Sequence, residues 1–364
     1  QVHGIQIIDL DPVYLLFTSG STGTPKGIVI SHRAILDFTD WLTDFCGYTE
    51  HEVFGNQSPF FYANSIIDIF PPALLGAKAC MIPATALSFP KTLVNYLRQK
   101  GVTELTMTPS SFVQVANSGV LTENCLPELE YMIMSGEVMP WAQLAVWMNA
   151  APKGHAWNFY GSTEMFSVSV GKVEGNYEAG QLIPVGKPFP TVKIRFMTDD
   201  GQVAAPGEAG EMYVSSPMVS QAYYRDEERS RAVYVADPLG QEPGVWFRSG
   251  DYGFLDAQGR LNVLGRKDSM VKHHGYRMEL GEVEAALRSI PGCLEACCLL
   301  DKEQDVLWAF AVGNLTEKAF MDALKTKLAR YMLPDKIVLL PELPHTANMK
   351  IDRQTLRKRM TEQG

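Results

Sequence analysis

The sequence predicts an α/β protein with a large N-terminal domain and a small α+β C-terminal domain. Strand-like and helix-like segments alternate over the first half of the chain, which implies partly parallel sheets with helices on their faces. From about residue 184, short strand-like segments separated by Gly and Pro predict an antiparallel, β-barrel-like subdomain. A charged, Gly-containing link at residues 264–268 then precedes a second alternation. We therefore expect domains at residues 1–267 and 268–364.

Apolar patterns place the individual elements. Residues 13–17 are uniformly apolar and predict a buried strand, with a second strand at 27–30. Ser31 is expected to cap a helix over residues 33–45. The other strands expected are 78–82, 104–107, 131–134, 192–197, 210–214, 245–247, 261–264, 296–300, 308–312 and 336–340, and the other helices are 91–99, 110–117, 281–289 and 317–331.

Composition excludes several classes of protein. The net charge of −9 argues against binding nucleic acid or an anionic membrane through overall charge. No apolar run reaches the roughly 18–20 residues of a membrane span, so no membrane insertion is expected. The six cysteines include no CxxC pair, which favours reduced thiols in a cytoplasmic protein over a zinc site or a disulfide framework.

Residues 18–27, Thr-Ser-Gly-Ser-Thr-Gly-Thr-Pro-Lys-Gly, predict a loop that holds phosphate oxygens. The glycines permit the positive φ angles of a tight anion-binding loop, and the hydroxyls and Lys26 supply donors and positive charge. A Walker A loop needs Gly-Lys, then Ser or Thr, then a helix, whereas here Pro25 precedes the lysine and a strand follows. A polar surface hairpin is the alternative for such a composition.

Residues 158–164, Asn-Phe-Tyr-Gly-Ser-Thr-Glu, bring a second group of functional side chains to the end of an expected strand. Tyr160 can stack on a base, Thr163 can hydrogen-bond a phosphate and Glu164 can bind Mg²⁺. A capped turn is the alternative. A phosphate loop in the same chain favours the functional interpretation.

Two further positions have suitable chemistry. Asp251 follows Gly250 at a strand end, where a carboxylate can accept hydrogen bonds from both ribose hydroxyls, although Gly-Asp is also a common turn. Lys350 lies in the string of residues 348–353, Asn-Met-Lys-Ile-Asp-Arg, and an exposed lysine is ordinarily only a solvated side chain.

Taken in their order along the chain, these sequence motifs resemble those of the adenylate-forming superfamily, which comprises acyl-CoA synthetases, luciferases and adenylation domains of peptide synthetases. Residues 247–251 are similar to its Tyr-Arg-Thr-Gly-Asp motif and residues 348–353 to its Asn-Gly-Lys-Ile-Asp-Arg motif, with Met349 in place of glycine. Ser162 stands where the superfamily has proline. Within the superfamily the chain looks most like the D-alanine–carrier-protein ligases. Because a domain-sized segment precedes the phosphate loop there, the resemblance implies that residues 1–267 are a truncated adenylation core.

The resemblance also implies a reaction and a role for each motif. ATP and Mg²⁺ would activate a carboxylate as an acyl-adenylate, with Thr163, Glu164 and Lys350 as catalytic residues and Glu164 holding the metal. Asp268 would be the hinge of a mobile C-terminal lid domain, and Gly275 and Tyr276 would line a tunnel for the phosphopantetheine thiol. The positions implied to bind the nucleotide are Thr18, Ser19, Gly20, Ser21, Thr22, Gly23, Lys26, Gly136, Glu137, Asn158, Phe159, Tyr160, Gly161, Ser162, Asp251 and Arg266.

The substrate pocket shows one departure from the superfamily. Members that activate amino acids place an aspartate where this chain has Ala63, and an unpaired buried ammonium is costly. Either the substrate lacks an α-amino group, or a residue such as Asn64 or Asp68 compensates, or Ala63 is an engineered substitution. A large Phe159 favours a small acid. The residues implied to line the pocket are Ala63, Asn64, Ile67, Thr106, Ile133, Ser135, Phe159, Ser167 and Val168.

The expected acyl acceptor is a carrier protein that bears phosphopantetheine. Two alternatives remain, an acyl-CoA synthetase for a small acid without an α-amino group and an inactive fragment that serves as an interaction module. The intact Lys26, Glu164, Asp251 and Lys350 argue against the inactive fragment.

Overall fold

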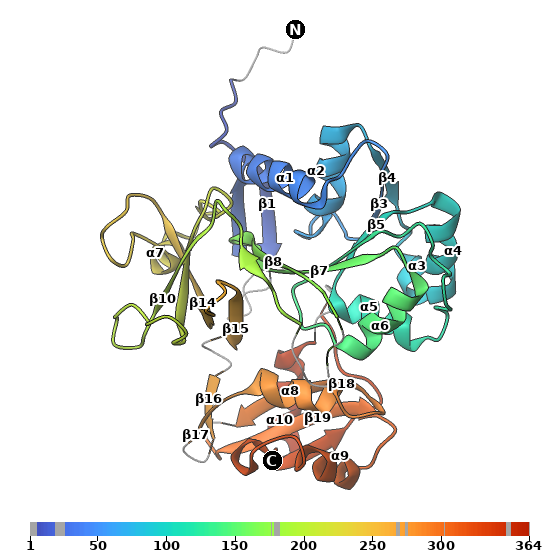
Figure 1. The fold of residues 1–364 in the computed structure, drawn as a ribbon. Helices are drawn as coiled ribbons and strands as arrows, with labels where there is room; N and C mark the ends of the chain where they lie inside the picture. The colour runs from blue at the N-terminus through green and yellow to red at the C-terminus, as the bar shows by residue number, and fades with distance from the viewer. Residues whose placement is uncertain are drawn as a thin grey trace. The chain divides into compact units, whose positions relative to one another are not determined.

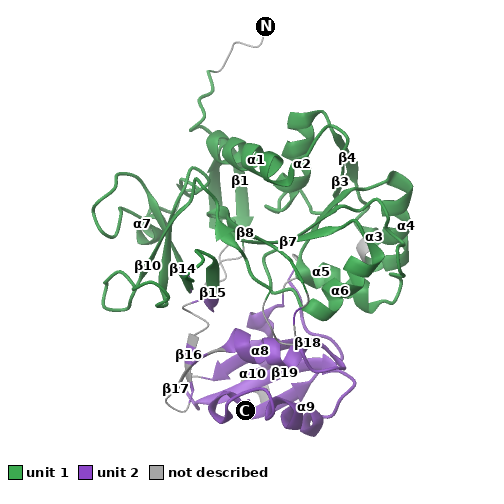
Figure 2. Ribbon diagram, in the orientation of Figure 1, with its two compact units in different colours: residues 1–175, 183–249, 253–263 green, residues 176–182, 250–252, 264–364 purple. Residues whose placement is uncertain are grey.

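The computed structural model describes residues 6–18, 26–175, 177, 183–266, 270–273, 276–301, 303–346 and 351–363. The chain divides into two units (Figure 2). The first comprises residues 1–175, 183–249 and 253–263, and the second comprises residues 176–182, 250–252 and 264–364. In the described residues, no helix combines the length and the apolar character needed to cross a bilayer.

A mostly parallel seven-stranded sheet forms the first unit's centre. The strands from β4 to β7 pair in parallel, and β8 and β9 add to them antiparallel. This arrangement confirms the α/β class. In order across the sheet, the strands are β4 (Lys78–Met81), β3 (Val53–Asn56), β5 (Glu104–Met107), β6 (Tyr131–Ser135), β7 (His155–Ser162), β8 (Phe166–Lys172) and β9 (Lys187–Pro188).

Helices cover both faces of this sheet. In Figure 1, α1 and α2 lie on one side and α5 and α6 on the other. The Ser31 hydroxyl accepts from the Ala34 amide and caps α1, as the sequence predicts. The helices of this unit are α1 (His32–Cys46), α2 (Ser65–Leu75), α3 (Thr85–Ser88), α4 (Pro90–Lys100), α5 (Pro109–Asn117), α6 (Trp141–Ala150) and α7 (Glu227–Val233).

The N-terminal hairpin pairs β1 (Pro12–Thr18) with β2 (Lys26–Ser31), and β12 (Ala222–Tyr223) adds to β2. The expectation of a buried first strand is wrong. Leu16 is buried, but Val13, Leu15 and Phe17 alternate with it and are exposed, Phe17 by 55%. Only one face of β1 packs on the core, with Leu16 and Tyr14, and the alternate side chains point to the other face.

The barrel-like subdomain predicted after residue 184 is a five-stranded sheet. Within it, β10 pairs antiparallel with β11, and β13 with β14. Its strands are β10 (Lys193–Met197), β11 (Gly210–Ser215), β13 (Tyr234–Val235), β14 (Trp246–Leu255) and β15 (Leu261–Arg266).

The second unit packs helices on both faces of the three-stranded sheet β18-β19-β20. Alternate residues of β18 point to opposite faces, so Cys298 packs with α8 and α9, whereas Cys297 packs with Leu356 of α10. Both thiols are free, and burial raises the pKa of Cys297 to about 12. The elements are β16 (Met270–His273), β17 (Tyr276–Glu279), α8 (Leu280–Arg288), β18 (Cys293–Asp301), β19 (Val306–Gly313), α9 (Glu317–Leu324), a 3₁₀ turn (Arg330–Met332), β20 (Lys336–Leu339) and α10 (Arg353–Gln363).

The helix expected over residues 317–331 ends early, at Leu324. Beyond it, Thr326 and Lys327 donate backbone hydrogen bonds to residues three positions earlier. The Thr326 hydroxyl also donates to the Ala323 carbonyl at 2.7 Å. A threonine side chain that bonds to a nearby carbonyl competes with the helical pattern and favours a turn.

A pair of carboxyl groups lies in the core of the first unit. Asp68 of α2 and Glu104 of β5 are both fully buried, and the Thr106 hydroxyl donates to Glu104 Oε1 at 2.7 Å. Burial raises the pKa of Glu104 to about 8 and raises that of Asp68 well above its usual range. The pair therefore holds at least one proton at neutral pH.

We expect the free energy of unfolding to depend on pH through this pair. Between about pH 4.5 and 8 the folded state binds more protons than the unfolded state, so stability is highest at the acid end and falls as the pH rises. The slope from one group is at most about 1.4 kcal/mol per pH unit. When unfolding by urea is measured across this pH range, the free energy of unfolding of Glu104→Gln should change less with pH than that of the parent protein. The exposed Glu128→Gln should match the parent, and equal slopes in all three proteins would contradict the prediction.

Candidate functional site

Lys26, Glu164 and Tyr223 meet at the end of the β1–β2 hairpin. Lys26 begins β2 and lies opposite Thr18, the last residue of β1. Its ammonium group forms an ion pair with Glu164 and donates to the Tyr223 hydroxyl at 3.0 Å. The Tyr223 hydroxyl donates in turn to Glu164 Oε1 at 3.0 Å, and Lys26 Nζ lies 4.7 Å from the centroid of the Tyr223 ring. Three separate chain segments thus converge on one carboxylate.

Glu164 is ionised in this setting. Burial opposes its charge, but the attraction of Lys26 and the hydrogen bonds from Lys26 and Tyr223 outweigh that effect and lower the pKa of Glu164. Lys26 itself keeps about a quarter of its side chain exposed. The site therefore presents a fixed carboxylate beside a cation that retains contact with solvent.

The β7–β8 turn fixes the position of Glu164. A register shift falls between Tyr160 and Gly161, and Phe166 on the opposing strand has a positive φ of 53°. A side chain on Gly161 would lie 1.6 Å from the Phe166 carbonyl oxygen, so the close approach of the two strands requires glycine. Thr163 and Glu164 occupy the turn that this approach creates.

Two buried hydroxyls beside this group have no hydrogen-bond partner within the described residues. They are Thr18 Oγ1, opposite Lys26, and Ser162 Oγ, two positions before Glu164. Buried hydroxyls are normally satisfied, so unpaired ones near a cation suit an anionic ligand with several acceptor oxygens. A nucleotide phosphate has these properties.

The same group can accept a divalent cation. Mg²⁺ is commonly held by one or two carboxylates together with substrate phosphates, and Glu164 supplies an ionised carboxylate. Over the described part of the chain, no cluster of three or more His, Cys, Asp or Glu side chains is arranged to hold a metal alone. A Mg²⁺ ion here would depend on the oxygens of the substrate.

Other predicted nucleotide-binding residues have partners within the protein. Glu137 accepts a hydrogen bond from the Ser110 amide at 3.0 Å, at the start of α5. The Asn158 amide donates to the Ile183 carbonyl at 2.9 Å. Gly136 has a positive φ of 90°, which glycine adopts readily. Tyr160 is half-buried near the end of β7.

The sheet register aligns the predicted substrate-pocket residues. Thr106 of β5 lies beside Ile133 of β6, and Ser135 of β6 lies beside Phe159 of β7. The register shift in β7–β8 places Ser167 opposite Gly161 and next to Val168. From α2 and the turn before it, Ala63 and Ile67 pack on the same core cluster as Ile133 and Phe159, and Ser135 donates to Asn64 at 3.0 Å. The nine predicted positions thus belong to one continuous region.

Asp251 and Arg266, two of the predicted nucleotide-binding residues, also lie together. Arg266 donates to Asp251 Oδ1 at 3.4 Å from the neighbouring strand. A side chain on Gly250 would lie 3.1 Å from the Arg266 guanidinium, so the glycine leaves room for this contact.

Several predicted residues lie outside the described part of the chain. They are Ser19, Gly20, Ser21, Thr22, Gly23, Asp268, Gly275 and Lys350, and of Tyr276 only the backbone is described, paired with His273 in β16–β17. The residues after Lys350 are anchored, because Ile351 bridges to His345 and Arg353 donates to the buried Glu284 at 2.6 Å.

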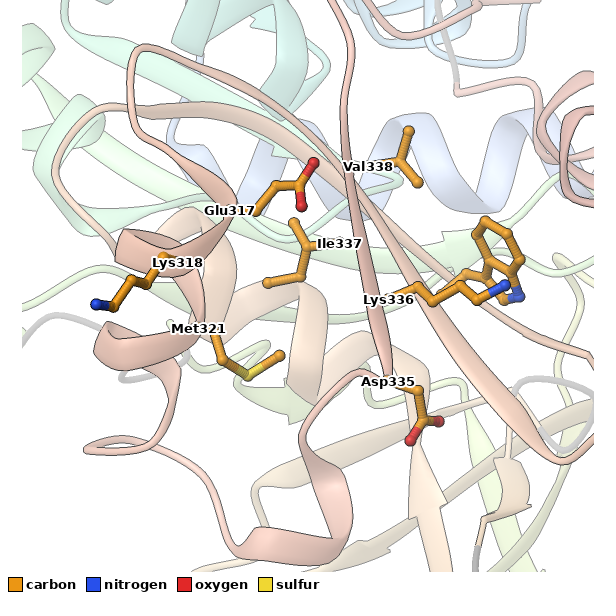
Figure 3. Close-up of a pocket in the computed structure, with 8 residues that line it drawn as sticks. Glu317, Lys318, Met321, Asp335, Lys336, Ile337 and Val338 are labelled. Carbon is orange, nitrogen blue, oxygen red and sulfur yellow. The ribbon is translucent and has the colours of Figure 1, made fainter. Parts of the chain in front are cut away.

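A hollow of about 500 Å³ lies on the second unit and contains none of the predicted site residues (Figure 3). Glu317, Lys318 and Met321 of α9 and Ile337 and Val338 of β20 line it. Lys336 lies 4.1 Å from the centroid of the Trp308 ring at its edge. No motif predicts this feature.

Sequence reasoning missed Tyr223. It lies in a strand of only two residues, where Tyr223 pairs with Ile28 of β2. A strand this short has no periodic pattern, and nothing in the sequence around it indicates a contact with Glu164.

Comparison with known proteins gives consistent matches. Residues 7–224 match the model for AMP-binding enzymes, and residues 282–350 match that for the AMP-binding enzyme C-terminal domain. The D-alanine–D-alanyl carrier protein ligase of Bacillus licheniformis is 32% identical over 96% of this chain and 72% of the relative. The L-proline–[L-prolyl-carrier protein] ligase of Pseudomonas fluorescens is 31% identical over 96% of this chain and 69% of the relative.

Solved structures agree in fold. ATP-bound MatB from Rhodopseudomonas palustris superposes with a TM-score of 0.85 at 21% identity, over 98% of this chain and 69% of that chain. A four-domain nonribosomal peptide synthetase bound to AMP and glycine superposes with a TM-score of 0.83 at 27% identity, over 94% of this chain and 26% of that chain.

Removal of Lys26 should destabilise the first unit through Glu164. Lys26→Met leaves a buried carboxylate without its cation and should lower the free energy of unfolding by about 3 kcal/mol at pH 7. Adding Glu164→Gln should recover most of this loss, because the unpaired charge is then absent. Urea denaturation of the single and double variants measures the coupling, with Lys193→Met, from an exposed pair with Glu242, as the control. Equal losses in the single and double variants would contradict the assignment.

Proposed function

The chain belongs to the family of AMP-binding enzymes, and from this premise we propose that it activates a small carboxylic or amino acid with ATP and transfers it to a carrier protein. The observation that carries the proposal is the ionised Glu164 paired with Lys26, beside the unpaired hydroxyls of Thr18 and Ser162. This group supplies the positive charge, the donors and the metal-binding carboxylate that a nucleotide triphosphate requires.

The proposed reaction has two steps. In the first, a carboxylate oxygen of the substrate attacks the α-phosphorus of ATP. A new P–O bond forms, the bond to the bridging oxygen breaks, and pyrophosphate leaves with that electron pair. In the second, a thiol sulfur attacks the carbonyl carbon of the acyl-adenylate, loses its proton and displaces AMP, which leaves a thioester. Neither step requires a nucleophile from the protein, so catalysis depends on position and charge.

The residues have separate tasks in this proposal. Lys26, the Thr18 and Ser162 hydroxyls and residues 19–23 bind the phosphates, with Thr163 beside them. Glu164 holds Mg²⁺, which neutralises phosphate charge when bound. Asp251 accepts from the ribose hydroxyls, with Arg266 positioned beside it. The remaining nucleotide contacts are assigned to Gly136, Glu137, Asn158, Phe159, Tyr160 and Gly161.

The C-terminal segment completes the proposed cycle. Lys350 bridges the substrate carboxylate and the α-phosphate in the first step. Residues 1–267 act as the adenylation core and residues 268–364 as a lid that turns about Asp268. The turn removes Lys350 and brings Gly275 and Tyr276 into place for the phosphopantetheine thiol.

A carrier protein is the favoured acceptor. Relatives at about 31% identity over most of this chain carry the names of carrier protein ligases. Coenzyme A is the alternative acceptor. The O-succinylbenzoate coenzyme A synthetase from Bacillus subtilis and an anthranilate CoA ligase, each 24% identical to this chain, support the fold alone. The reaction consumes ATP, and we place it in the cytoplasm.

ATP–pyrophosphate exchange tests the first step. The purified chain should catalyse exchange with D-alanine or L-alanine, and the assay should include propionate, lactate and small aromatic acids. Glu164→Gln should lower the rate by about 10²–10³-fold, as the loss of one charge-stabilising group does at other sites. Glu128→Gln, which alters an exposed carboxylate, is the matched control. Exchange with none of these acids, although ATP raises the melting temperature, would reject the proposed activity.

Acyl transfer tests the second step. After adenylation, a phosphopantetheine-bearing carrier protein should accumulate thioester, whereas free coenzyme A should not. Faster transfer to coenzyme A than to the carrier would favour the acyl-CoA synthetase instead.

A further inference from the structure

Tyr223 connects the two charged residues of the candidate site. Its hydroxyl accepts a hydrogen bond from the Lys26 ammonium group at 3.0 Å and donates one to Glu164 Oε1 at 3.0 Å. These directions are fixed, because an ammonium group can only donate and an ionised carboxylate can only accept. Lys26 also pairs directly with Glu164 Oε1. Each side chain of this triangle is thus bonded to the other two.

The triangle determines which atoms are left for a ligand. Lys26 has three N–H donors, of which one is directed at Glu164 and one at Tyr223, and no described residue accepts from the third. Both side-chain hydrogen bonds to Glu164 end on Oε1, so Oε2 is the oxygen left for a cation. The Lys26 side chain is 25% exposed and that of Glu164 is 9% exposed, so both retain contact with solvent.

Backbone pairing holds Tyr223 in this place. β12 pairs Tyr223 with Ile28 of β2, which lies two positions after Lys26 and on the same face of the sheet. The Ser220 amide donates to the Glu164 carbonyl at 2.7 Å, which ties the segment before β12 to the β7–β8 turn. Tyr223 itself is only 6% exposed. Its hydroxyl therefore has little freedom to turn away from the two charged groups.

An anion alone or a cation alone fits this group poorly. A phosphate at the third N–H of Lys26 lies near the negative charge of Glu164, and a divalent cation at Glu164 Oε2 lies near the positive charge of Lys26. Like charges this close raise the free energy of a site with little solvent. A divalent cation that is already joined to phosphate oxygens satisfies both residues together. The ligand class that matches the group is therefore a metal–phosphate complex.

We propose that Tyr223 is a positioning residue that directs the third N–H of Lys26 and Oε2 of Glu164 to one ligand, a nucleoside triphosphate together with its divalent cation. The proposal rests on the proposed function and deepens it, because it names the form of the nucleotide that the site selects. Tyr223 acts through the two charged side chains rather than on the ligand. Without its hydroxyl, Lys26 is the only side-chain donor to Glu164, and the carboxylate can turn Oε2 toward the ammonium group instead of a cation.

Binding of ATP with and without Mg²⁺ measures this selection directly. Calorimetric titration of the whole chain with ATP, in excess Mg²⁺ and in EDTA, gives two dissociation constants, and their ratio is the informative quantity. The parent protein should bind ATP more tightly with Mg²⁺. Tyr223→Phe keeps the ring and removes the hydroxyl, and should reduce this preference about tenfold, as the loss of one hydrogen bond to a charged group does. A purely structural role would weaken both binding reactions alike and leave the ratio unchanged.

Tyr234→Phe is the matched control. The Tyr234 ring centroid lies 5.5 Å from that of Tyr223, but its hydroxyl bonds to Ser220 rather than to Lys26 or Glu164. This variant should keep the parent ratio. The melting temperature of each variant without nucleotide verifies that it is folded.

A double variant tests the route through Glu164. Glu164→Gln should itself reduce the preference for ATP with Mg²⁺, because it removes the charge that attracts the cation. Adding Tyr223→Phe should then change the ratio little, since a residue that acts through Glu164 has no carboxylate left to position. A further fall of about tenfold in the double variant would contradict the assignment.

The outcomes separate the inference from the function on which it rests. Equal binding of ATP by the parent with and without Mg²⁺ would overturn the inference, and ATP–pyrophosphate exchange by the same protein would leave adenylate formation intact. An unchanged ratio in Tyr223→Phe would also overturn the inference alone. Failure of the parent to bind ATP under either condition would overturn the proposed function, and the inference with it.

Discussion

The ion pair of Lys26 with Glu164 is the interaction on which the geometry of the candidate site depends. The two residues are 138 positions apart in the chain, and Tyr223 joins them from a third segment. A carboxylate with this little exposure is stable in its charged form only with a partner. The pair therefore keeps the β1–β2 hairpin, the β7–β8 turn and β12 together. The negative charge that holds these segments together also suits the Glu164 carboxylate to bind a metal ion. The same ion pair therefore matters for both the stability of the site and its proposed chemistry.

Parallel strand register is the second constraint, because it decides which residues of neighbouring strands share a face of the sheet. Leu105 and Met132 pair on one face, and Thr106 and Ile133 on the other. Every strand in register extends this division, up to the shift at Gly161. There the alternation of side chains between the two faces shifts by one residue, and the chain enters the turn at residues 163–165. The regular sheet thus ends in the polar turn that carries Glu164.

Local patterns in the sequence predicted the strand–helix order, the capped α1 and the motif residues, and the structure brings Lys26 to Glu164 and Asp251 to Arg266. Burial was harder to predict. The apolar β1 is half exposed, because what covers each face of an edge strand is not encoded in that strand. The early end of α9 depends on a side-chain hydrogen bond of Thr326. Tyr223 and the Asp68–Glu104 pair depend on contacts between distant segments, which neither periodicity nor spacing contains.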